Sequence, residues 1–194
     1  MVIAVSESTR ATVLVVDDEP EVADVYALRL ETAFETRVAY GGEEALAAVD
    51  DDVDIVLLDR RMPSLSGDEV LEQLRDEGHD TRVIMLTAVD PGMDIIDMPF
   101  DDYLCKPVEK DDLTAAISQQ IRAKRYDTRL SEYMKVTSKL ALLEAELSAQ
   151  EVSENDRLQD LSQRADDLKE QMDDALEGFE DIDTAFQEIG RHHG

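Results

Sequence analysis

The feature that most constrains the fold is a series of five short apolar runs, separated by stretches in which apolar residues recur at helical spacing. The runs are residues 12–16, 36–40, 54–58, 82–86 and 102–105. The first is continuous and rich in β-branched residues, as a strand buried on both faces requires. Strands that alternate with helices predict an α/β fold of βαβ units, with a parallel sheet and helices on both faces.

Polar side chains follow four of these runs. They are Asp17, Asp18, Asp59, Thr87 and Lys106. Ligands of such sheets bind beyond the carboxyl ends of the strands. If the first and third strands are neighbours, three carboxylates converge there and raise one another's pKa unless a cation is present. Helix capping or hydration would explain one aspartate, but not five such residues at successive strand ends.

These residue types indicate phosphoryl chemistry on a carboxylate. Mg²⁺ prefers carboxylate, carbonyl and water oxygens. A hydroxyl from Thr87 and the ammonium of Lys106 suit the oxygens of a phosphoryl group beside that metal. Asp59 is the central carboxylate, and it is therefore the candidate nucleophile for a transient acyl phosphate. The residues predicted to carry this chemistry are thus Asp59, Thr87 and Lys106.

The motifs that hold these residues resemble the receiver domain of two-component response regulators. They are VVDDE at 15–19, LLDRRMP at 57–63 with Gly67, LTA at 86–88 and YLCKP at 103–107. The resemblance covers residues 11–124 and implies a flavodoxin-like (βα)₅ doubly wound fold. It also implies transfer of a phosphoryl group from a sensor histidine kinase to Asp59, in a signalling protein that promotes only its own phosphorylation and dephosphorylation.

The resemblance further implies a role for each site residue. Asp18, Asp59 and the main-chain carbonyl of Arg61 would bind Mg²⁺, and Asp17 would act largely through a metal-bound water. Thr87 and Lys106 would hold the phosphoryl oxygens. By the same resemblance, Tyr103 would be the aromatic switch. The Lys106–Pro107 peptide bond would be cis, a form that is accessible mainly before proline.

Two features depart from the family pattern. Nineteen positions separate Thr87 from Lys106, about one helical turn fewer than usual, and the segment 90–99 has prolines near both ends. This predicts a short or irregular fourth helix and leaves open whether the usual output surface is retained. Arg60 and Arg61 directly follow the acceptor. A bulky Arg61 would slow hydrolysis of the acyl phosphate, or it is a solvated side chain, and we weigh the two interpretations equally.

The remainder of the chain predicts two long helices. Residues 108–177 contain neither proline nor glycine. An apolar stripe extends to Leu147, polar residues at 148–155 interrupt it, and Ser153 with Asp156 resembles a capping box. From Leu158 to Ile189, apolar residues alternate gaps of three and four, which is a heptad seam. The pattern predicts an antiparallel helical hairpin or coiled coil, with a partner helix in the same chain favoured over a second chain.

This helical region resembles the HalX domain that follows receivers in halophilic archaea. The expected organisation is an N-terminal tail at 1–10, a receiver at 11–124, a HalX-like domain at 125–190 and a frayed terminus at 191–194. The resemblance implies little about function beyond a regulatory or DNA-binding element. We therefore expect output through protein–protein association of the tail, including homodimerisation, and keep as the alternative a transcription regulator whose tail contacts DNA directly.

Charge restricts the partners. The chain has 47 acidic and 19 basic residues, a net charge of -28, which excludes a generally basic nucleic-acid binder and opposes binding to anionic membranes. This excess favours a salt-loving host over an ordinary acidic protein. The single cysteine, Cys105, agrees with a reducing compartment, and no apolar run is long enough to span a membrane. A cytoplasmic location is expected.

The charge of the tail is uneven. Residues 122–139 carry six basic and two acidic side chains, whereas residues 151–188 carry fourteen acidic and three basic ones. The basic stretch would contact phosphates or a partner, or it would neutralise the acidic second helix through ion pairs. High intracellular salt weakens phosphate contacts steeply, and no helix-turn-helix pattern is present. Direct contact with DNA is therefore not favoured.

Overall fold

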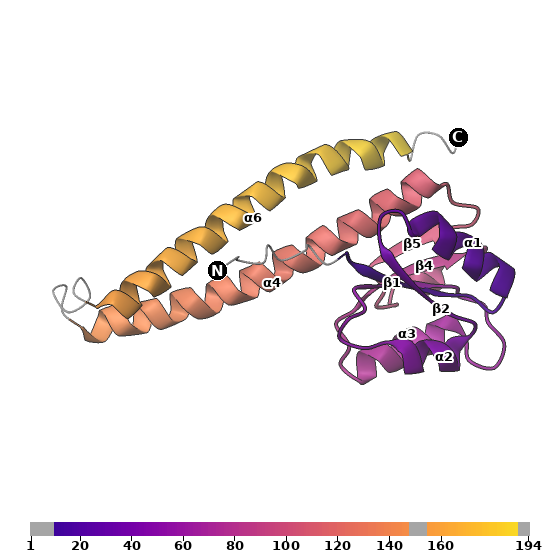
Figure 1. Ribbon diagram of the computed structural model, residues 1–194, viewed down its shortest axis with the longest axis horizontal. Coiled ribbons are helices and arrows are strands. Elements are labelled where there is room, and N and C mark those ends of the chain that lie inside the picture. Colours follow the sequence, from indigo (N-terminus) through magenta and orange to yellow (C-terminus); the bar gives the residue numbers. More distant parts are fainter. Residues whose placement is uncertain (1–9, 148–154, 190–194) are drawn as a thin grey trace, which may run out of the picture. The chain divides into compact units, whose positions relative to one another are not determined.

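The described part of the chain forms two compact units, with the boundary between Ile121 and Arg122. The structure, a computed structural model, describes residues 10–147 and 155–189, the last of them (176–189) by their helical backbone alone (Figure 1). Each unit has its own hydrophobic core. None of the helices among these described residues combines the length and the apolar character needed to cross a bilayer.

The first unit is built on a five-stranded sheet in which every pair of neighbours is parallel. The strands are β1 (Thr12–Val16), β2 (Glu35–Ala39), β3 (Ile55–Leu58), β4 (Arg82–Thr87) and β5 (Asp102–Cys105). Their order is β2-β1-β3-β4-β5. The predicted parallel sheet is confirmed, and β1 and β3 are neighbours, paired from Val13 opposite Ile55 to Val16 opposite Leu58.

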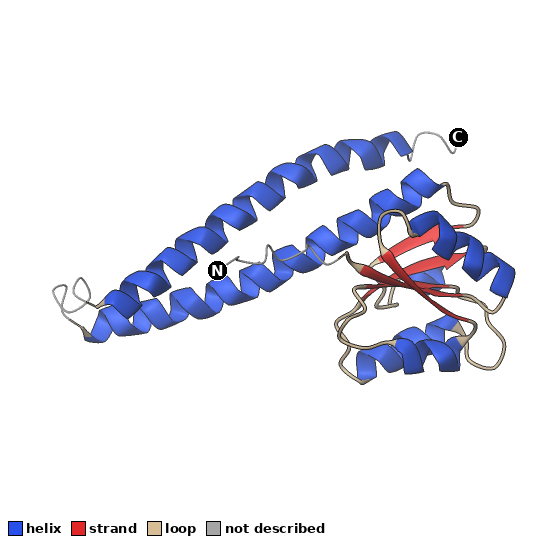
Figure 2. Ribbon diagram, in the orientation of Figure 1, coloured by secondary structure: helices blue, strands red, loops and turns tan. Residues whose placement is uncertain are grey.

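Helices cover both faces of this sheet (Figure 2). On one face, α1 (Pro20–Leu30) and the beginning of α4 (Lys110–Glu146) pack on Val13 and Val15; on the other, α2 (Gly42–Ala48) and α3 (Gly67–Asp76) pack on Leu14 and Val16. Successive side chains of a strand point to opposite faces, so the continuous apolar run of β1 supplies both cores. This arrangement is the flavodoxin-like fold.

Local sequence signals explain where two of these helices begin. Pro20 occupies the first turn of α1, where its missing N–H costs no hydrogen bond. At the start of α3, Ser66 and Glu69 form a capping box, in which each side chain accepts a hydrogen bond from the other residue's main-chain N–H. The capping box fixes the start of α3 directly after the loop that follows β3.

The predicted shortening of the fourth helix is confirmed. Between β4 and β5 the chain forms only a 3₁₀ turn, η1 (Met93–Ile95). Pro91 and Pro99 flank this turn, and a proline interrupts the hydrogen bonding of a longer helix. The predicted cis peptide bond between Lys106 and Pro107 is also present.

The second unit contains the continuation of α4 and the helix α6 (Asp156–Ile189), which form an antiparallel hairpin. Glu132 pairs with Arg164, and Arg129 with the main chain of Gln171, so positions descend along α4 as they ascend along α6. The predicted hairpin is confirmed. Its core is made of Val136, Ala165 and Leu168, with Tyr133, Leu140 and Leu161 packed around them.

Two sequence expectations about this unit fall outside the described residues. Ser153, the first residue of the predicted capping box, lies outside the described residues. The helix α6 begins at Asp156. The side chain of Asn155, just before it, accepts hydrogen bonds from the main-chain N–H groups of Arg157 and Leu158. The seam residues beyond Ala175 lie on helical backbone whose side chains are not described. On the expected stripe of α4, Leu143 is 40% exposed, so part of that stripe faces solvent.

Candidate functional site

The carboxyl ends of four adjacent strands bring the candidate residues to one edge of the sheet. Asp17 follows β1, Asp59 follows β3, Thr87 ends β4 and Lys106 follows β5. The Lys106 ammonium donates hydrogen bonds to the carboxylates of both Asp17 and Asp59, the second with a Nζ–Oδ1 distance of 3.1 Å. Three residues from distant parts of the chain, Asp17, Asp59 and Lys106, thus form one charged cluster.

This cluster is largely removed from water. The side chains of Asp17, Asp59 and Lys106 are 5%, 10% and 16% exposed. Burial raises the pKa of Asp59 above its usual value, and the charge and hydrogen bond of Lys106 oppose that rise only in part. Burial lowers the pKa of Lys106, but Asp17 and Asp59 outweigh it and hold that pKa above its usual value. Lys106 therefore stays charged and compensates two buried acids.

Main-chain groups fix the orientation of both carboxylates. The N–H of Glu19 donates to Asp17 Oδ1 at 2.9 Å, and the N–H of Arg61 donates to Asp59 Oδ2 at 3.1 Å. Gly67 packs against the main chain at Asp59, where an added Cβ would lie 2.2 Å from the carbonyl oxygen. The start of α3 therefore approaches the candidate nucleophile as closely as only glycine allows.

The sequence predicted three converging carboxylates, and Lys106 joins two of them, Asp17 and Asp59. Among the described residues, no group of three acidic, histidine or cysteine side chains is arranged to hold a metal ion. Asp18 follows Asp17 at a bend between β1 and α1. Asp17 is buried at the cluster, and Asp18 is only half-buried. The main chain at Arg61 lies beside Asp59, because the Arg61 N–H donates a hydrogen bond to the Asp59 carboxylate.

The two candidate switch residues are joined through Val89. Thr87 is buried, and its hydroxyl accepts a hydrogen bond from the main-chain N–H of Val89 at 3.3 Å. The hydroxyl of Tyr103 donates to the main-chain oxygen of the same residue at 2.7 Å. Thr87 and Tyr103 therefore bind the two adjacent peptide groups that meet at Val89.

Sequence reasoning noted Arg60 but missed its partners. Its guanidinium binds Asp68 of α3 through two nitrogens, with distances of 3.0 Å from Nε to Oδ1 and 3.1 Å from Nη2 to Oδ2. The same guanidinium forms an ion pair with Asp94 of η1. Arg60 also interacts with Tyr103 of β5: burial raises the pKa of Tyr103, and the hydrogen bond and charge of Arg60 oppose that rise. Tyr103 therefore belongs to the same network. The only sequence signal was a basic residue directly after the candidate acceptor.

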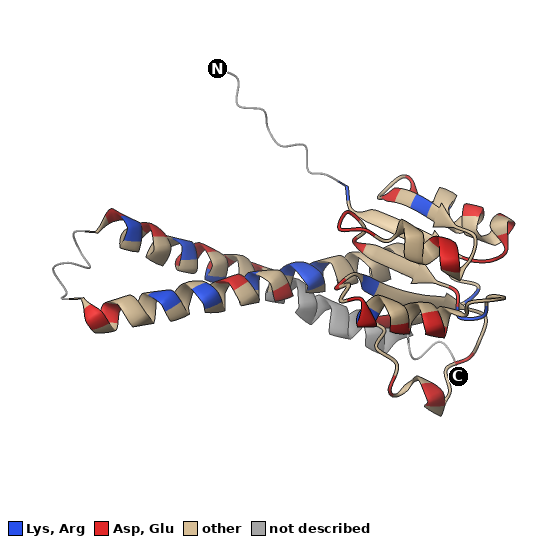
Figure 3. Cartoon of the chain, turned by 90° about the horizontal axis from the view of Figure 1, so that it is seen from below, with Lys and Arg blue, Asp and Glu red and all other residues tan. Residues whose placement is uncertain are grey.

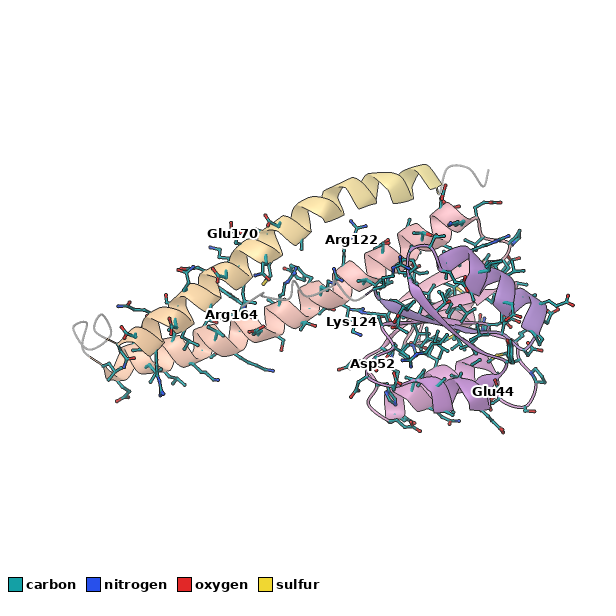
Figure 4. The ribbon with its side chains drawn as sticks, in the orientation of Figure 1. Glu44, Asp52, Arg122, Lys124, Arg164 and Glu170 are labelled. Carbon is teal, nitrogen blue, oxygen red and sulfur yellow. The ribbon has the colours of Figure 1, made fainter. Side chains whose placement is uncertain are left out.

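A second group of basic residues lies in the helical unit. Arg122, Arg125 and Arg129 line a cavity of about 350 Å³ together with Gln171, Asp174 and Ala175. Arg122 lies on the side of α4 that faces α6 (Figure 4). Figure 3 shows further Lys and Arg residues along both helices. In the ion pair of Glu132 with Arg164, the acidic residue is on α4 and the basic residue is on α6. The net charges of the two segments predicted the opposite arrangement, with basic residues of α4 paired to acidic residues of α6.

The fold and the strand-end cluster define a receiver-type α/β domain, and the family comparison agrees. Residues 13–118 match the response regulator receiver domain, and residues 122–189 match the HalX domain. The chain belongs to the response regulator receiver family and continues into a HalX domain. Residues 13–118 are accordingly a receiver domain of the two-component type.

Individual relatives support this assignment. A Haloferax volcanii protein named "Putative transcriptional regulator" is 44% identical over 150 residues, which are 77% of this chain and 26% of that protein. The transcriptional regulatory protein CpxR of Escherichia coli K12 is 40% identical over 114 residues, 57% of this chain and 49% of CpxR. The chain thus spans about a quarter of the length of the Haloferax volcanii protein and about half of the length of CpxR.

Two of the solved structures that resemble this chain are receiver domains. The receiver domain of the Francisella response regulator 1452 is 32% identical with a TM-score of 0.55, and the match covers 59% of this chain and 98% of that domain. The receiver domain of a Vibrio parahaemolyticus Luxo repressor protein is 26% identical with a TM-score of 0.56, covering 61% and 96%. Both therefore correspond to the part of this chain that holds the strand-end cluster.

Proposed function

We propose that Asp59 is the residue that accepts the phosphoryl group, from a sensor histidine kinase. The observation that carries this proposal is the buried cluster in which Lys106 binds Asp59 and Asp17 together at the carboxyl edge of the sheet. A carboxylate with a pKa above its usual value is a better nucleophile than an exposed one, and a fixed ammonium beside it stabilises the charge that the phosphoryl group brings.

The proposal includes Mg²⁺. Two carboxylates that share a single ammonium form an all-oxygen anionic site, and Mg²⁺ commonly binds through one or two carboxylates plus phosphate oxygens. Asp59 would hold it together with Asp18 and the main-chain carbonyl of Arg61, and Asp17 would act largely through a metal-bound water, as the family resemblance implies. When bound, the ion would neutralise charge on the transferred group.

We infer that Thr87 and Tyr103 transmit the phosphorylation state. A phosphoryl group on Asp59 offers strong acceptor oxygens to the Thr87 hydroxyl. If that hydroxyl turns towards them, it gives up the hydrogen bond from Val89 N–H. Val89 is then less restrained, so the neighbouring carbonyl that binds the Tyr103 hydroxyl can shift and the aromatic side chain can move with it.

Intact mass spectrometry tests the acceptor. The protein is incubated with a small-molecule phosphodonor and Mg²⁺ in high KCl, beside Asp59→Asn and the exposed control Asp97→Asn. We expect the mass of one phosphoryl group on the wild type and on Asp97→Asn, and none on Asp59→Asn. No gain in any variant would make this a degenerate receiver, and a gain retained in Asp59→Asn would exclude Asp59 as the acceptor.

For output, we propose regulated association through the helical unit, with a second copy of the chain as the first candidate partner. The hairpin buries Val136 and Leu168 but leaves Met134 60% and Leu142 70% exposed on α4. Exposed apolar side chains on a long helix are typical of helix–helix interfaces. The proposal includes a cytoplasmic location, which suits the exposed free thiol of Cys105.

Light scattering in high KCl with Mg²⁺, with and without beryllofluoride as a phosphoryl mimic, tests association. We expect a mimic-dependent increase in molar mass that Asp59→Asn does not show. Replacing Met134 and Leu142 with serine should abolish the increase, whereas the same change at the buried Val136 would unfold the hairpin and is not informative. A monomer under all conditions would contradict self-association.

A second candidate output is direct contact with DNA, which the arginine-lined cavity favours. Arg122, Arg125 and Arg129 are spaced by three and four and therefore share one face of α4. The test is affinity for promoter fragments over a range of KCl concentrations. If these arginines contact phosphates, replacing all three with glutamine should reduce the salt slope by about 0.9 per lost contact, and replacing the exposed Lys135 and Lys139 should not. Equal slopes would exclude this role.

A further inference from the structure

The segment 90–98, between β4 and β5, is fastened at its two ends. Before it, the Tyr103 hydroxyl binds the main-chain oxygen of Val89 at 2.7 Å. After it, Arg75 Nε donates to the main-chain oxygen of Pro99 at 3.2 Å. At rest, the freedom of the segment between these two points depends on what holds its middle.

Met98, at the end of the segment, packs on the sheet core, and the middle of the segment is tied by an ion pair. Within the described residues, Asp94 supplies the only side-chain ion pair of the segment 90–98, and its partner is Arg60. The two main-chain hydrogen bonds that close η1 have N–O distances of 3.4 Å, at the long end of the useful range. The ion pair of Asp94 with Arg60 is therefore the main polar restraint on η1.

Arg60 is suited to act as a rigid anchor. Its side chain is only 11% exposed, and Asp68 of α3 binds it in a two-pronged arrangement. Asp94, in contrast, is 57% exposed. Of the two carboxylates on the guanidinium, Asp94 is thus the more weakly held, because water competes for it and it has fewer bonds. Arg60 is also the residue directly after Asp59.

We propose that Arg60 is a positioning residue that latches η1 to α3 while Asp59 is unphosphorylated, and that phosphorylation releases Asp94 from this latch. The inference rests on the proposed phosphorylation of Asp59. A phosphoryl group adds a charge of about -1.5 to -2 at neutral pH, next in the chain to Arg60. That charge competes for the guanidinium, and the exposed, singly bonded Asp94 is displaced before Asp68.

Release of η1 has a consequence at the surface. The turn carries two exposed apolar side chains, Met93 at 83% and Ile96 at 67%. While the latch holds, their positions are fixed relative to α3; once it opens, they are free to adopt a new arrangement. The signal would then be read on the short segment between β4 and β5 rather than on a full fourth helix.

Hydrogen exchange of the full chain, at fixed high KCl with Mg²⁺, tests the latch. In the absence of phosphodonor, Asp94→Asn should raise the exchange rates of amides 92–98 about twofold to fivefold, as loss of one partly exposed ion pair implies. The control Asp97→Asn removes the same charge from an exposed neighbour and should leave them unchanged. Asp94→Glu keeps the charge and should restore the slow rates.

Beryllofluoride supplies the readout that a merely structural role would not change. It should raise exchange at 92–98 in the wild type to the level of Asp94→Asn and cause no further rise in Asp94→Asn itself. Unchanged rates in Asp94→Asn, equal effects of Asp94→Asn and Asp97→Asn, or an additive effect of beryllofluoride would each overturn the proposal.

Failure of the latch and failure of the acceptor assignment remain distinguishable. A phosphoryl mass gain on Asp59 without any change of exchange at 92–98 rejects release by phosphorylation and leaves the acceptor intact. No mass gain rejects the acceptor and, with it, release by phosphorylation. The comparison of Asp94→Asn with Asp97→Asn still decides whether the latch restrains η1 at rest.

Discussion

Replacing Lys106 with methionine should destabilise the first unit strongly and in a pH-dependent way. Methionine keeps most of the volume of the lysine stem but removes its charge. Asp17 and Asp59, whose side chains are 5% and 10% exposed, then face one another without a cation. Removing one partner of a buried ion pair costs about 3–5 kcal/mol, because the remaining charge stays buried. We expect a loss of unfolding free energy of about this size at neutral pH.

The same reasoning fixes how the loss depends on pH and Mg²⁺. Lys106 opposes the raised pKa of Asp59, so Lys106→Met should raise that pKa further. Asp59 is then protonated more readily, and the difference from the wild type should shrink as the pH falls towards mildly acidic values. Added Mg²⁺ should stabilise Lys106→Met in proportion to RT ln(1 + [Mg²⁺]/Kd), by replacing the missing positive charge.

Denaturant unfolding at constant high KCl measures these differences. High salt screens the general effect of changing the net charge but acts weakly on a buried cluster. The control Lys169→Met removes the same charge from an exposed position of α6 and should change the stability of the first unit by less than about 0.5 kcal/mol. A loss below about 1 kcal/mol for Lys106→Met, independent of pH, would refute the view that Lys106 compensates two buried acids.

Three further changes have clear expected outcomes. Gly67→Ala should destabilise the first unit by about 1–3 kcal/mol in denaturant unfolding and slow phosphorylation, because its Cβ would lie 2.2 Å from the carbonyl oxygen of Asp59; wild-type values would contradict the close approach. Leu168→Ala, at a side chain 1% exposed, should cost the hairpin about 2–5 kcal/mol, seen as an earlier thermal loss of helical circular dichroism, whereas Leu142→Ala should not. The pKa of Lys106 lies above its usual value in the folded state, so from neutral pH up to about 10.4 the stability it contributes is complete, and it is lost as the pH rises through the folded pKa; titration of unfolding free energy beside Lys106→Met above neutral pH would show this, and parallel curves would disprove it.

The elements of the first unit follow closely from local sequence. The five apolar runs became five strands with shifts of about one residue, because continuous β-branched runs favour a strand buried on both faces. Prolines at 91 and 99 correctly predicted a shortened fourth helix. In the tail, apolar spacing of three and four predicted the hairpin, because that spacing places the side chains on one helical stripe.

The composition of the site was harder to predict, because it depends on side-chain direction. Strand ends indicated that Asp17, Asp59, Thr87 and Lys106 would meet, since parallel strands share one carboxyl edge. They did not indicate that Lys106 would bind two carboxylates at once. Sequence position fixes the strand end that a residue follows, and the local direction of the backbone decides where its side chain points.

What the sequence determined by itself, therefore, is the set of elements and the edge at which the polar residues gather, because both depend on neighbours within a few positions. Only the tertiary structure decided the contacts between residues far apart in the chain. Lys106 reaches Asp17 across 89 positions, and Arg60 reaches Asp94 across 34. Such contacts require a strand order of β2-β1-β3-β4-β5 and an exact path for the segment between β4 and β5. Hydrophobic periodicity carries no information about that order, because every strand of the sheet presents similar apolar faces to both helical layers.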